Sequence, residues 1–236
     1  MENSLGQKTY DYLRRKLARG ELPPGTQLVN RSLAKEIGVS FTPVREAIHR
    51  LANEGLVEYV RGTGAFIRQP DRHEIAQLYD LRLLFEPYGA REAARHMTRY
   101  ELEGLQDICD QWLNLAKTIR ASGRKAANGE EAASFFDLEE AFHSQMLQAA
   151  RNRWLTKIAE ELHVMSVAFI PSRLDPGVMN LSVIAWTWLG HARVVRALER
   201  RNSEQAGELL SQHIARGKQL VLNRFPWKGP PGNLLG

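Results

Sequence analysis

The hydrophobic positions that follow Asn30 repeat at helical spacing up to about residue 54 and at strand spacing after it. Apolar residues first repeat at helical spacing, in a short helix that we expect Asn30 to cap and the left-handed conformation of Gly38 to end. A second helix is predicted over residues 42–54, with Ser40 or Thr42 as its cap. Its inward-facing stripe comprises Val44, Ala47, Ile48 and Leu51.

A strand pattern follows the second helix. Residues 56–60 and 65–67 predict two strands joined by a glycine-rich turn at residues 61–64. Two short helices joined by a tight turn, with Arg45 on the outer face of the second, are typical of a helix-turn-helix, and the hairpin would form its wing. A preceding helix at residues 7–19 completes the unit. We therefore predict a winged helix-turn-helix domain at residues 1–69.

Strand patterns disappear after a short hinge at residues 69–71. The rest of the chain predicts a mainly α protein, with an all-α bundle of about six helices at residues 70–225. Pro87 falls inside the first of these helices, which we expect it to kink or break. Residues 226–236 are rich in proline and glycine, and we expect a disordered tail there. The predicted helices span residues 72–96, 99–120, 131–150, 153–170, 184–200 and 203–224.

Composition narrows the cellular setting. No apolar run reaches the roughly 18 residues that a membrane span needs, and the first residues lack the apolar core of a signal peptide. The one cysteine, Cys109, cannot form an internal disulfide and lies in an apolar helical row, where we expect it to be buried. We therefore expect a cytoplasmic protein that does not contact membranes.

The positive charge of the chain is concentrated near its start. The first 70 residues hold 11 Lys and Arg against 7 Asp and Glu, whereas the remainder holds 21 against 20. A partner with a phosphate backbone is the simplest explanation of a basic helix-turn-helix. A solvated basic surface would explain the charge equally well if charge were the only observation.

These residues resemble the GntR family of bacterial transcriptional regulators. The segments PPGTQLVNRSLAKEIGVS, TPVREAI, RLANEGLVE and GAF are close to its N-terminal signature and cover nearly all of residues 9–67. The bundle resembles the FCD effector domain of the FadR subfamily through LRLLFEP at 81–87, AFHSQMLQAARN at 141–152, and His191 followed 22 residues later by His213. In its compact size the bundle resembles the domains of the six-helix, VanR-like branch. The resemblance implies a metabolite-responsive, homodimeric regulator that reads a palindromic operator.

Arg45 is the strongest candidate for DNA contact, because a guanidinium on the outer face of a recognition helix reaches phosphates or pairs with a guanine edge. Hydroxyl groups near the helix start can donate to phosphates. The resemblance adds a position in the preceding helix and two at the wing tip. The complete predicted set is Arg31, Ser40, Phe41, Thr42, Arg45, Thr63 and Gly64.

Phe41 is where the chain departs from the family pattern, which usually has arginine at this position. A phenyl ring cannot pair with guanine, although it can pack on a thymine methyl group. We therefore expect the operator sequence to differ from the usual one.

A second constellation lies in the bundle. Glu139 and His143 are four residues apart, so they share one helix face. With His191 and His213 from the last two helices they would offer three imidazoles and one carboxylate, a set that suits Zn²⁺, Ni²⁺ or Mn²⁺. Single histidines on apolar helices are more often satisfied core groups. The resemblance favours a metal, because many FCD domains hold one with an aspartate and three histidines at these places.

The carboxylate of this set is open to two readings. Glu139 stands where the family usually has aspartate, and Glu140 is the substitute candidate.

Arg82 is a separate candidate, predicted either to pair with Glu86 four residues later or, as the resemblance suggests, to clamp a small carboxylate effector. Arg173 and Asp175 are weaker candidates for the entrance of such a site.

The sequence thus predicts a DNA-binding transcriptional regulator, a repressor if it follows most of its family, controlled by a small organic acid at a metal site. The alternative is a metal-dependent hydrolase with a three-histidine site and Glu140 or Asp137 as base, although no H-E-x-x-H motif is present. A third reading, a protein-binding winged helix, would not need Arg45 to be exposed.

Overall fold

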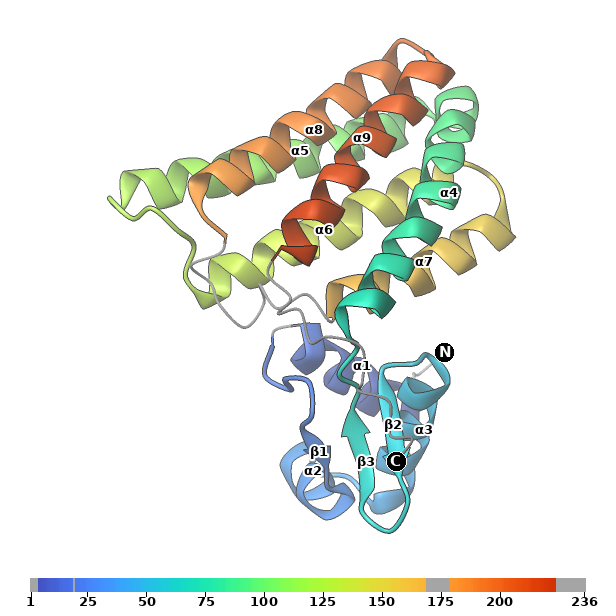
Figure 1. Ribbon diagram of the computed structural model, residues 1–236, viewed down its shortest axis with the longest axis vertical. Helices are drawn as coiled ribbons and strands as arrows, with labels where there is room; N and C mark the ends of the chain where they lie inside the picture. Colours follow the sequence, from blue (N-terminus) through green and yellow to red (C-terminus); the bar gives the residue numbers. More distant parts are fainter. Residues whose placement is uncertain (1–3, 19, 169–178, 224–236) are drawn as a thin grey trace, which may run out of the picture.

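The computed structural model describes residues 4–18, 20–168 and 179–223 of the 236. These residues form a small N-terminal unit of helices and strands below a larger helical bundle (Figure 1). The predicted fold class, a winged helix-turn-helix joined to an all-α bundle, is confirmed. The expected disordered tail at residues 226–236 and the entrance candidates Arg173 and Asp175 lie outside the described residues.

The N-terminal unit packs three helices against a small sheet. Its described strands are all antiparallel and run in the order β1-β3-β2, so β3 is the central strand. The hairpin of β2 and β3 forms the wing, and the short β1 pairs with its inner edge. The elements are α1 (Leu5–Ala18), β1 (Gln27–Leu28), α2 (Asn30–Ile37), α3 (Phe41–Asn53), β2 (Val57–Val60) and β3 (Gly64–Ile67).

The turn between α2 and α3 follows the sequence signals with two exceptions. Gly38 adopts φ 77° and its backbone N–H donates to the carbonyl of Ala34, as expected of a left-handed helix end. Asn30, however, is the first residue of α2, and Val29 occupies the N-cap. Ser40 occupies the N-cap of α3 without a hydrogen bond from its side chain to that helix. The hydroxyl of Ser40 therefore remains accessible at the helix start.

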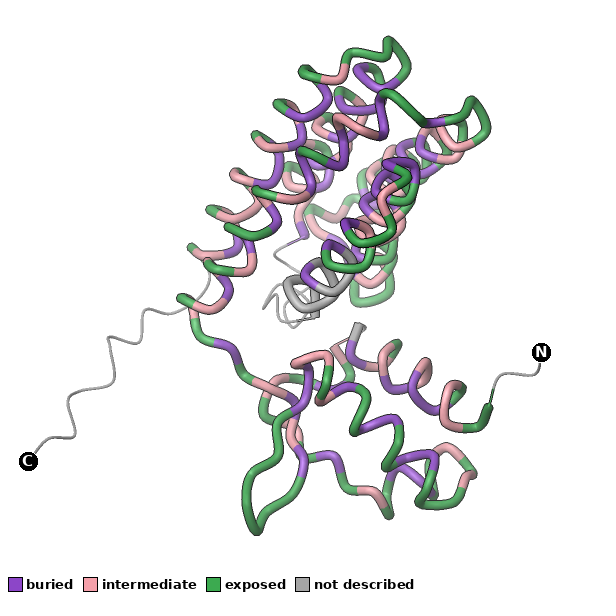
Figure 2. Tube along the Cα trace, turned by 90° about the vertical axis from the view of Figure 1, so that its right-hand side faces the viewer, coloured by how far each residue is buried: buried purple, intermediate pink, exposed green. Residues whose placement is uncertain are grey.

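The C-terminal unit is a bundle in which α4 packs against α6, α7 and α9, while α5 packs against α6 and α8. The buried faces of these helices point toward one another (Figure 2). Its elements are α4 (Arg72–His96), α5 (Arg99–Ala121), α6 (Gly129–Ala149), α7 (Arg153–Ala168), α8 (Leu181–Glu199) and α9 (Ser203–Leu222). These six helices match the number predicted for the bundle.

Pro87 does not break its helix. It is buried within α4, which runs without interruption from Arg72 to His96. Proline removes one backbone donor and its ring crowds the preceding turn. Because α4 packs against four other helices, tertiary packing offsets this local cost. Of the two effects expected of Pro87, a kink or a break, the break was wrong. The start of α8 also differs: Asn180 caps it, and it begins at Leu181, three residues before the expected start at residue 184.

The two units contact each other beside their connection. Arg14 of α1 forms an ion pair with Glu140 of α6, with 3.1 Å between Nη2 and Oε1. Arg68 after β3 pairs with Glu74 in the first turn of α4, and Asp71 caps that helix in a reciprocal capping box. The link between winged helix and bundle is therefore held by charged contacts. In the described parts of the chain, every helix is too short or too polar to cross a membrane.

Candidate metal centre and nucleic-acid interface

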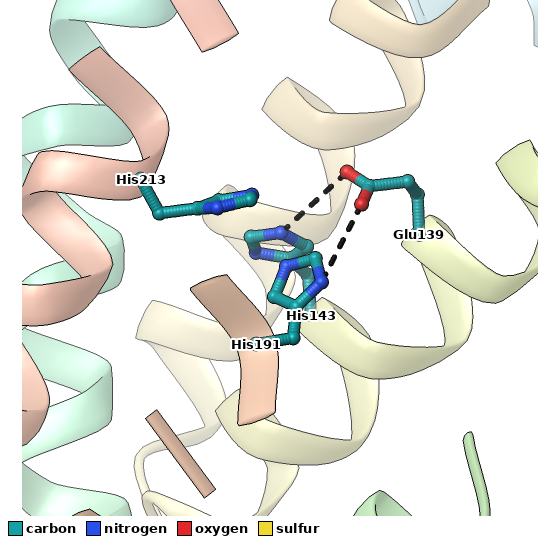
Figure 3. Close-up of side chains that lie close together, drawn as sticks. All are labelled: Glu139, His143, His191 and His213. Atoms are coloured by element: carbon teal, nitrogen blue, oxygen red, sulfur yellow. Dashed lines mark ion pairs between the residues drawn. The ribbon is translucent and has the colours of Figure 1, made fainter. Parts of the chain in front are cut away.

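The helix hairpin of α8 and α9 brings two histidines to the same level of the bundle. His191 lies ten residues before Arg201 in the turn, and His213 lies twelve after it. At 1.5 Å per residue in two antiparallel helices, these positions differ in height by only about 3 Å. α6 contributes Glu139 and His143 from one face. The four side chains come from three helices and meet in the interior (Figure 3).

One ligand atom from each of these four residues lies within 4.8 Å of the others. Glu139 carries the central carboxylate: its Oε2 is 3.9 Å from Nε2 of His143, and its Oε1 is 3.6 Å from Nδ1 of His191. Two ligand atoms on opposite sides of one ion are about 4.2 Å apart when each bond is about 2.1 Å long. A small contraction of the cluster would therefore suffice for coordination.

Glu139, and not Glu140, is the carboxylate that faces the histidines. Glu140 is directed to Arg14 of the winged helix instead. The hydrolase reading needed Glu140 or Asp137 beside the metal, and Asp137 is an exposed residue that lines a different groove. Neither proposed base belongs to the four-residue cluster.

Glu86 is a functional candidate that the sequence reading missed. Its Oε2 lies 2.5 Å from Nδ1 of His143, and its Oε1 accepts a hydrogen bond from Nε of Arg82 at 2.5 Å. Burial alone would raise the pKa of Glu86, but the charges of Arg82 and His143 outweigh it and hold that pKa well below its usual range. An ionised Glu86 fixes the ring of His143 with Nε2 turned toward the cluster. The spacing of Arg82 and Glu86 was visible in the sequence, but the contact with a distant helix was not.

Aromatic rings hold the other two histidines. Trp112 of α5 stacks on His191 with ring centroids 4.5 Å apart, and Trp186 stacks on His213 at 4.7 Å. Gly190 gives His213 its space, since a Cβ atom built at this glycine would lie 2.4 Å from Nδ1 of His213. The positions of both rings are thus set by packing as well as by helix geometry.

The electrostatics of the cluster fit a divalent ion. Burial, followed by the charges of His143 and Arg82, lowers the pKa of His213 to about 3, so its imidazole is neutral, as a metal ligand requires. Burial raises the pKa of Glu139, because its carboxylate loses contact with water, and a bound cation would stabilise the charged form. Oε1 of Glu139 and Nδ1 of His213 are buried without a hydrogen-bond partner among the described residues. Buried polar atoms in this state are uncommon, and an ion would satisfy both.

A cavity of about 70 Å³ adjoins the cluster. Glu139 and His213 form part of its wall, and Arg82 lines it as well. A single water molecule needs about 10–15 Å³ on this measure, so the cavity has room for a small organic molecule. Both expectations for Arg82 are compatible with its position, because it pairs with Glu86 and also borders the cavity.

A separate groove lies on the winged helix. It joins Arg31 of α2 and Arg45 of α3 to Thr63 and Gly64 at the wing, which are four of the seven predicted DNA-contacting residues. The other three, Ser40, Phe41 and Thr42, are exposed at the start of α3. The side chain of Phe41 is 55% exposed, which is unusual for a phenylalanine and leaves its ring available to a partner.

The groove also contains residues that the sequence reading passed over. His49 and Tyr59 line it, and their ring centroids are 5.3 Å apart. His49 lies four residues after Arg45, so helical spacing predicts the same outward face for both, although no role in DNA binding was predicted for His49. Alternation in β2 would have placed Tyr59 on the same face as the buried Val57, yet Tyr59 is 53% exposed, so the strand pattern did not point to it.

A basic groove on a winged helix, connected to an all-α bundle, is typical of a DNA-binding transcriptional regulator. Comparison with protein families agrees: residues 5–67 match the model "Bacterial regulatory proteins, gntR family", and residues 77–216 match "FCD domain". The chain belongs to the GntR family, in the branch with an FCD domain. The resemblance drawn from the sequence motifs is thereby confirmed.

Individual relatives support the same assignment. The chain is 26% identical to the HTH-type transcriptional regulator LutR of Bacillus subtilis, over 89% of this chain and 97% of the relative. It is 25% identical to the HTH-type transcriptional repressor RspR of Escherichia coli, over 89% and 86% of the two chains. The solved structure of E. coli McbR/YncC shares the fold, with a TM-score of 0.80 and 18% identity over 94% and 99% of the chains. The protein is a transcriptional regulator and not an enzyme, so the hydrolase alternative is not supported.

Proposed function

We propose that this regulator binds an operator in double-stranded DNA through α3 in the major groove and the wing in the adjacent minor groove. One observation carries this proposal: a single concave surface joins Arg31 and Arg45 to Thr63 and Gly64. Arginines at a helix surface supply phosphate and guanine contacts, and the small wing residues allow close approach to a narrow groove. Ser40, Phe41 and Thr42 would contact DNA at the start of α3.

The regulator acts as a homodimer on a palindromic site in this proposal, because twofold symmetry of the protein requires twofold symmetry of the operator. An exposed apolar stripe supports a second copy: Leu81, Leu84 and Tyr88 of α4 are 40%, 68% and 45% exposed. Trp154 of α7, a helix that packs against α4, is 61% exposed. Such a surface is costly in water and is typical of a protein interface. We place the dimer in the cytoplasm, where its operator would be.

The input site is the buried cluster. Glu139, His143, His191 and His213 would hold Zn²⁺, Ni²⁺ or Mn²⁺, since three neutral imidazoles and one carboxylate match the preferences of these ions. The ion would supply positive charge to attract an anion. Arg82, on the wall of the adjoining cavity, would contribute a second cationic group to a small carboxylate effector.

The input reaches the output through α6. Glu139 faces the cluster while its neighbour Glu140 binds Arg14 of the winged helix. A shift of α6 on ligand binding would therefore change the contact that orients the DNA-binding unit. This makes the regulator a two-state switch whose population the effector biases. In this proposal the regulator represses transcription and effector binding relieves the repression, in line with the relative named as a repressor.

A gel-shift assay tests the proposal. Purified protein is incubated with DNA from its own promoter region at low salt, with and without a chelator, and with an unrelated duplex of equal length as control. We expect a specific complex whose affinity changes when the metal is removed. Equal binding to both duplexes would refute operator recognition, and an affinity for operator that the chelator leaves unchanged would refute the metal-linked switch.

A further inference from the structure

We infer that the effector is a compact monocarboxylic acid with an apolar body, in preference to a sugar acid, a dicarboxylate or an acid with a hydroxyl group on its body. This inference rests on the proposed function of the same site and narrows its ligand class. It is carried by the contrast between the charged cluster that borders the cavity and the mostly apolar side chains that make up the rest of the described lining.

Most of the described residues that line the cavity are apolar. Phe135 and Phe136 of α6, Val183 and Trp186 of α8, and Ile214 of α9 line it. Among the described lining residues outside the proposed metal ligands, only Tyr79, Arg82, Thr187 and, through its indole N–H, Trp186 carry a polar group on the side chain. A ligand whose carboxylate meets the cluster would therefore extend its body along aromatic and branched aliphatic side chains.

Hydroxyl groups on the ligand would find few partners there. A buried hydroxyl that exchanges water for a hydrocarbon wall loses its hydrogen bonds, which lowers affinity by roughly tenfold or more for each unmatched group. An apolar body gains from the same burial, because it leaves water for a surface with which it can make van der Waals contact. The wall thus discriminates against polyhydroxy acids by chemistry rather than by size.

A second carboxylate is also disfavoured. Arg82 is the cationic side chain of the described lining, and its charge is already paired with the buried Glu86 at 2.5 Å. Glu139 brings a further negative charge to the same wall. One proposed ion and one neutralised guanidinium therefore offer enough positive charge for a single carboxylate, and a second buried anion would have no counter-charge among the described lining residues.

The volume limits the size of the body. A cavity of about 70 Å³ admits an acid of a few carbon atoms. The body would lie next to Trp186, whose indole stacks on His213 at 4.7 Å. Tryptophan fluorescence therefore provides a local signal of occupancy, independent of any effect on DNA.

Pentanoate and 4-hydroxybutyrate form a matched pair that tests this inference, since they differ only by a terminal methyl group replaced with a hydroxyl, at the end of the molecule remote from the carboxylate. Zinc-loaded full-length protein is titrated with each acid and with succinate, by calorimetry and by tryptophan fluorescence. We expect pentanoate to bind roughly tenfold or more tightly than 4-hydroxybutyrate, and succinate to bind weakest. Equal or tighter binding of 4-hydroxybutyrate or succinate, or no binding of pentanoate to protein with a full complement of zinc, would overturn the inference.

A variant of the wall provides the second arm. Val183→Thr replaces a methyl group of the partly buried Val183 with a hydroxyl of similar size, so we expect the preference for pentanoate over 4-hydroxybutyrate to narrow. An unchanged preference would count against the apolar wall as its cause. Operator binding by the same samples without acid is measured in parallel. Intact operator binding with a reversed acid preference defeats this inference alone, whereas loss of operator binding by wild-type protein defeats the proposed function.

Discussion

Glu139 and Glu140 are consecutive residues of α6 whose carboxylates belong to different sites. Oε1 of Glu139 lies 3.6 Å from Nδ1 of His191 in the buried cluster, and Oε1 of Glu140 lies 3.1 Å from Nη2 of Arg14 in the winged helix. Neighbouring positions on a helix point about 100° apart, so one turn of α6 serves both the interior and the domain contact. The residue that faces the proposed input site and the residue that contacts the DNA-binding unit are thus neighbours in the chain.

Replacing Arg14 with alanine should weaken the communication between ligand and DNA. The side chains of the Arg14–Glu140 pair are 36% and 41% exposed, so the pair contributes at most about 1 kcal/mol, and the ligand-induced change in operator affinity should fall by no more than about fivefold. Gel shifts with and without effector measure this change. Arg99→Ala, which removes a more exposed pair within α5 (90% and 54% exposed), is the control. An effector response equal to that of wild type would remove Arg14 from the coupling.

Substitution of Glu86 by glutamine should weaken metal binding although Glu86 is not a proposed ligand. The amide cannot hold His143 as the carboxylate does, and loss of such an orienting partner typically costs 10–100-fold in metal affinity. Competition with a calibrated chelator measures the affinity. Glu92→Gln on the same helix removes a carboxylate that pairs with Arg95 away from the cluster, and should have no effect. Wild-type affinity in the Glu86 variant would contradict the orienting role.

A methyl group added at Gly190 should displace His213. The new Cβ atom would lie 2.4 Å from Nδ1 of that ring, closer than such contacts allow. We expect Gly190→Ala to reduce metal content, measured by elemental analysis, while circular dichroism retains the helical signal. Gly129→Ala introduces the same atom where nothing lies within 4 Å, and should keep its metal. Full metal content in the Gly190 variant would show that His213 is not needed in its present position.

Removal of Arg45 should reduce operator affinity roughly 10–100-fold, the usual loss for a base or phosphate contact of this kind. The dependence of binding on salt concentration should also become shallower. Arg50 lies on the same helix but packs over the ring of Tyr10, with 3.7 Å from Cζ to the centroid, so Arg50→Ala controls for the loss of charge. Operator binding by Arg45→Ala at wild-type strength would refute α3 as the reading helix.

Cys109 should be unreactive in the folded protein. Burial, helped by the charge of Asp110, raises the pKa of its thiol to about 12, and the thiolate is the reactive form. At pH 8 a thiol reagent should label the protein only after a denaturant is added. Because the folded pKa exceeds the unfolded value, the unfolded chain binds fewer protons between about pH 9 and 12, so this residue lowers stability as pH rises through that range. Rapid labelling at neutral pH without denaturant would show that the thiol is accessible.

Local signals in the sequence were enough to predict most of the fold. Gly38 and the wing glycines require backbone conformations that only a few residue types adopt, so they marked the helix-turn-helix and hairpin directly. Pro87 was misread because its local cost is offset by helices far away in the sequence. The N-cap at Val29 was missed because asparagine is the stronger capping residue by propensity.

The candidate site was predictable only in part, because some of its contacts join residues that are far apart in the sequence. Glu139 and His143 share a helix face at a spacing visible in the sequence, and family resemblance supplied His191 and His213. The choice between Glu139 and Glu140 depends on how α6 is rotated against α1, which no local pattern records. The contact between Glu86 and His143 joins residues 57 positions apart, so only the assembled bundle reveals it.

The central claim is that metal in the bundle controls DNA binding by the winged helix. Its most direct test is the operator affinity of wild type and of His191→Ala, each measured with and without chelator in the same gel-shift assay. We expect the chelator to change the affinity of wild type and to leave the variant, which should already lack metal by elemental analysis, unchanged. An equal response of both proteins to the chelator, or identical metal content in both, would contradict the claim.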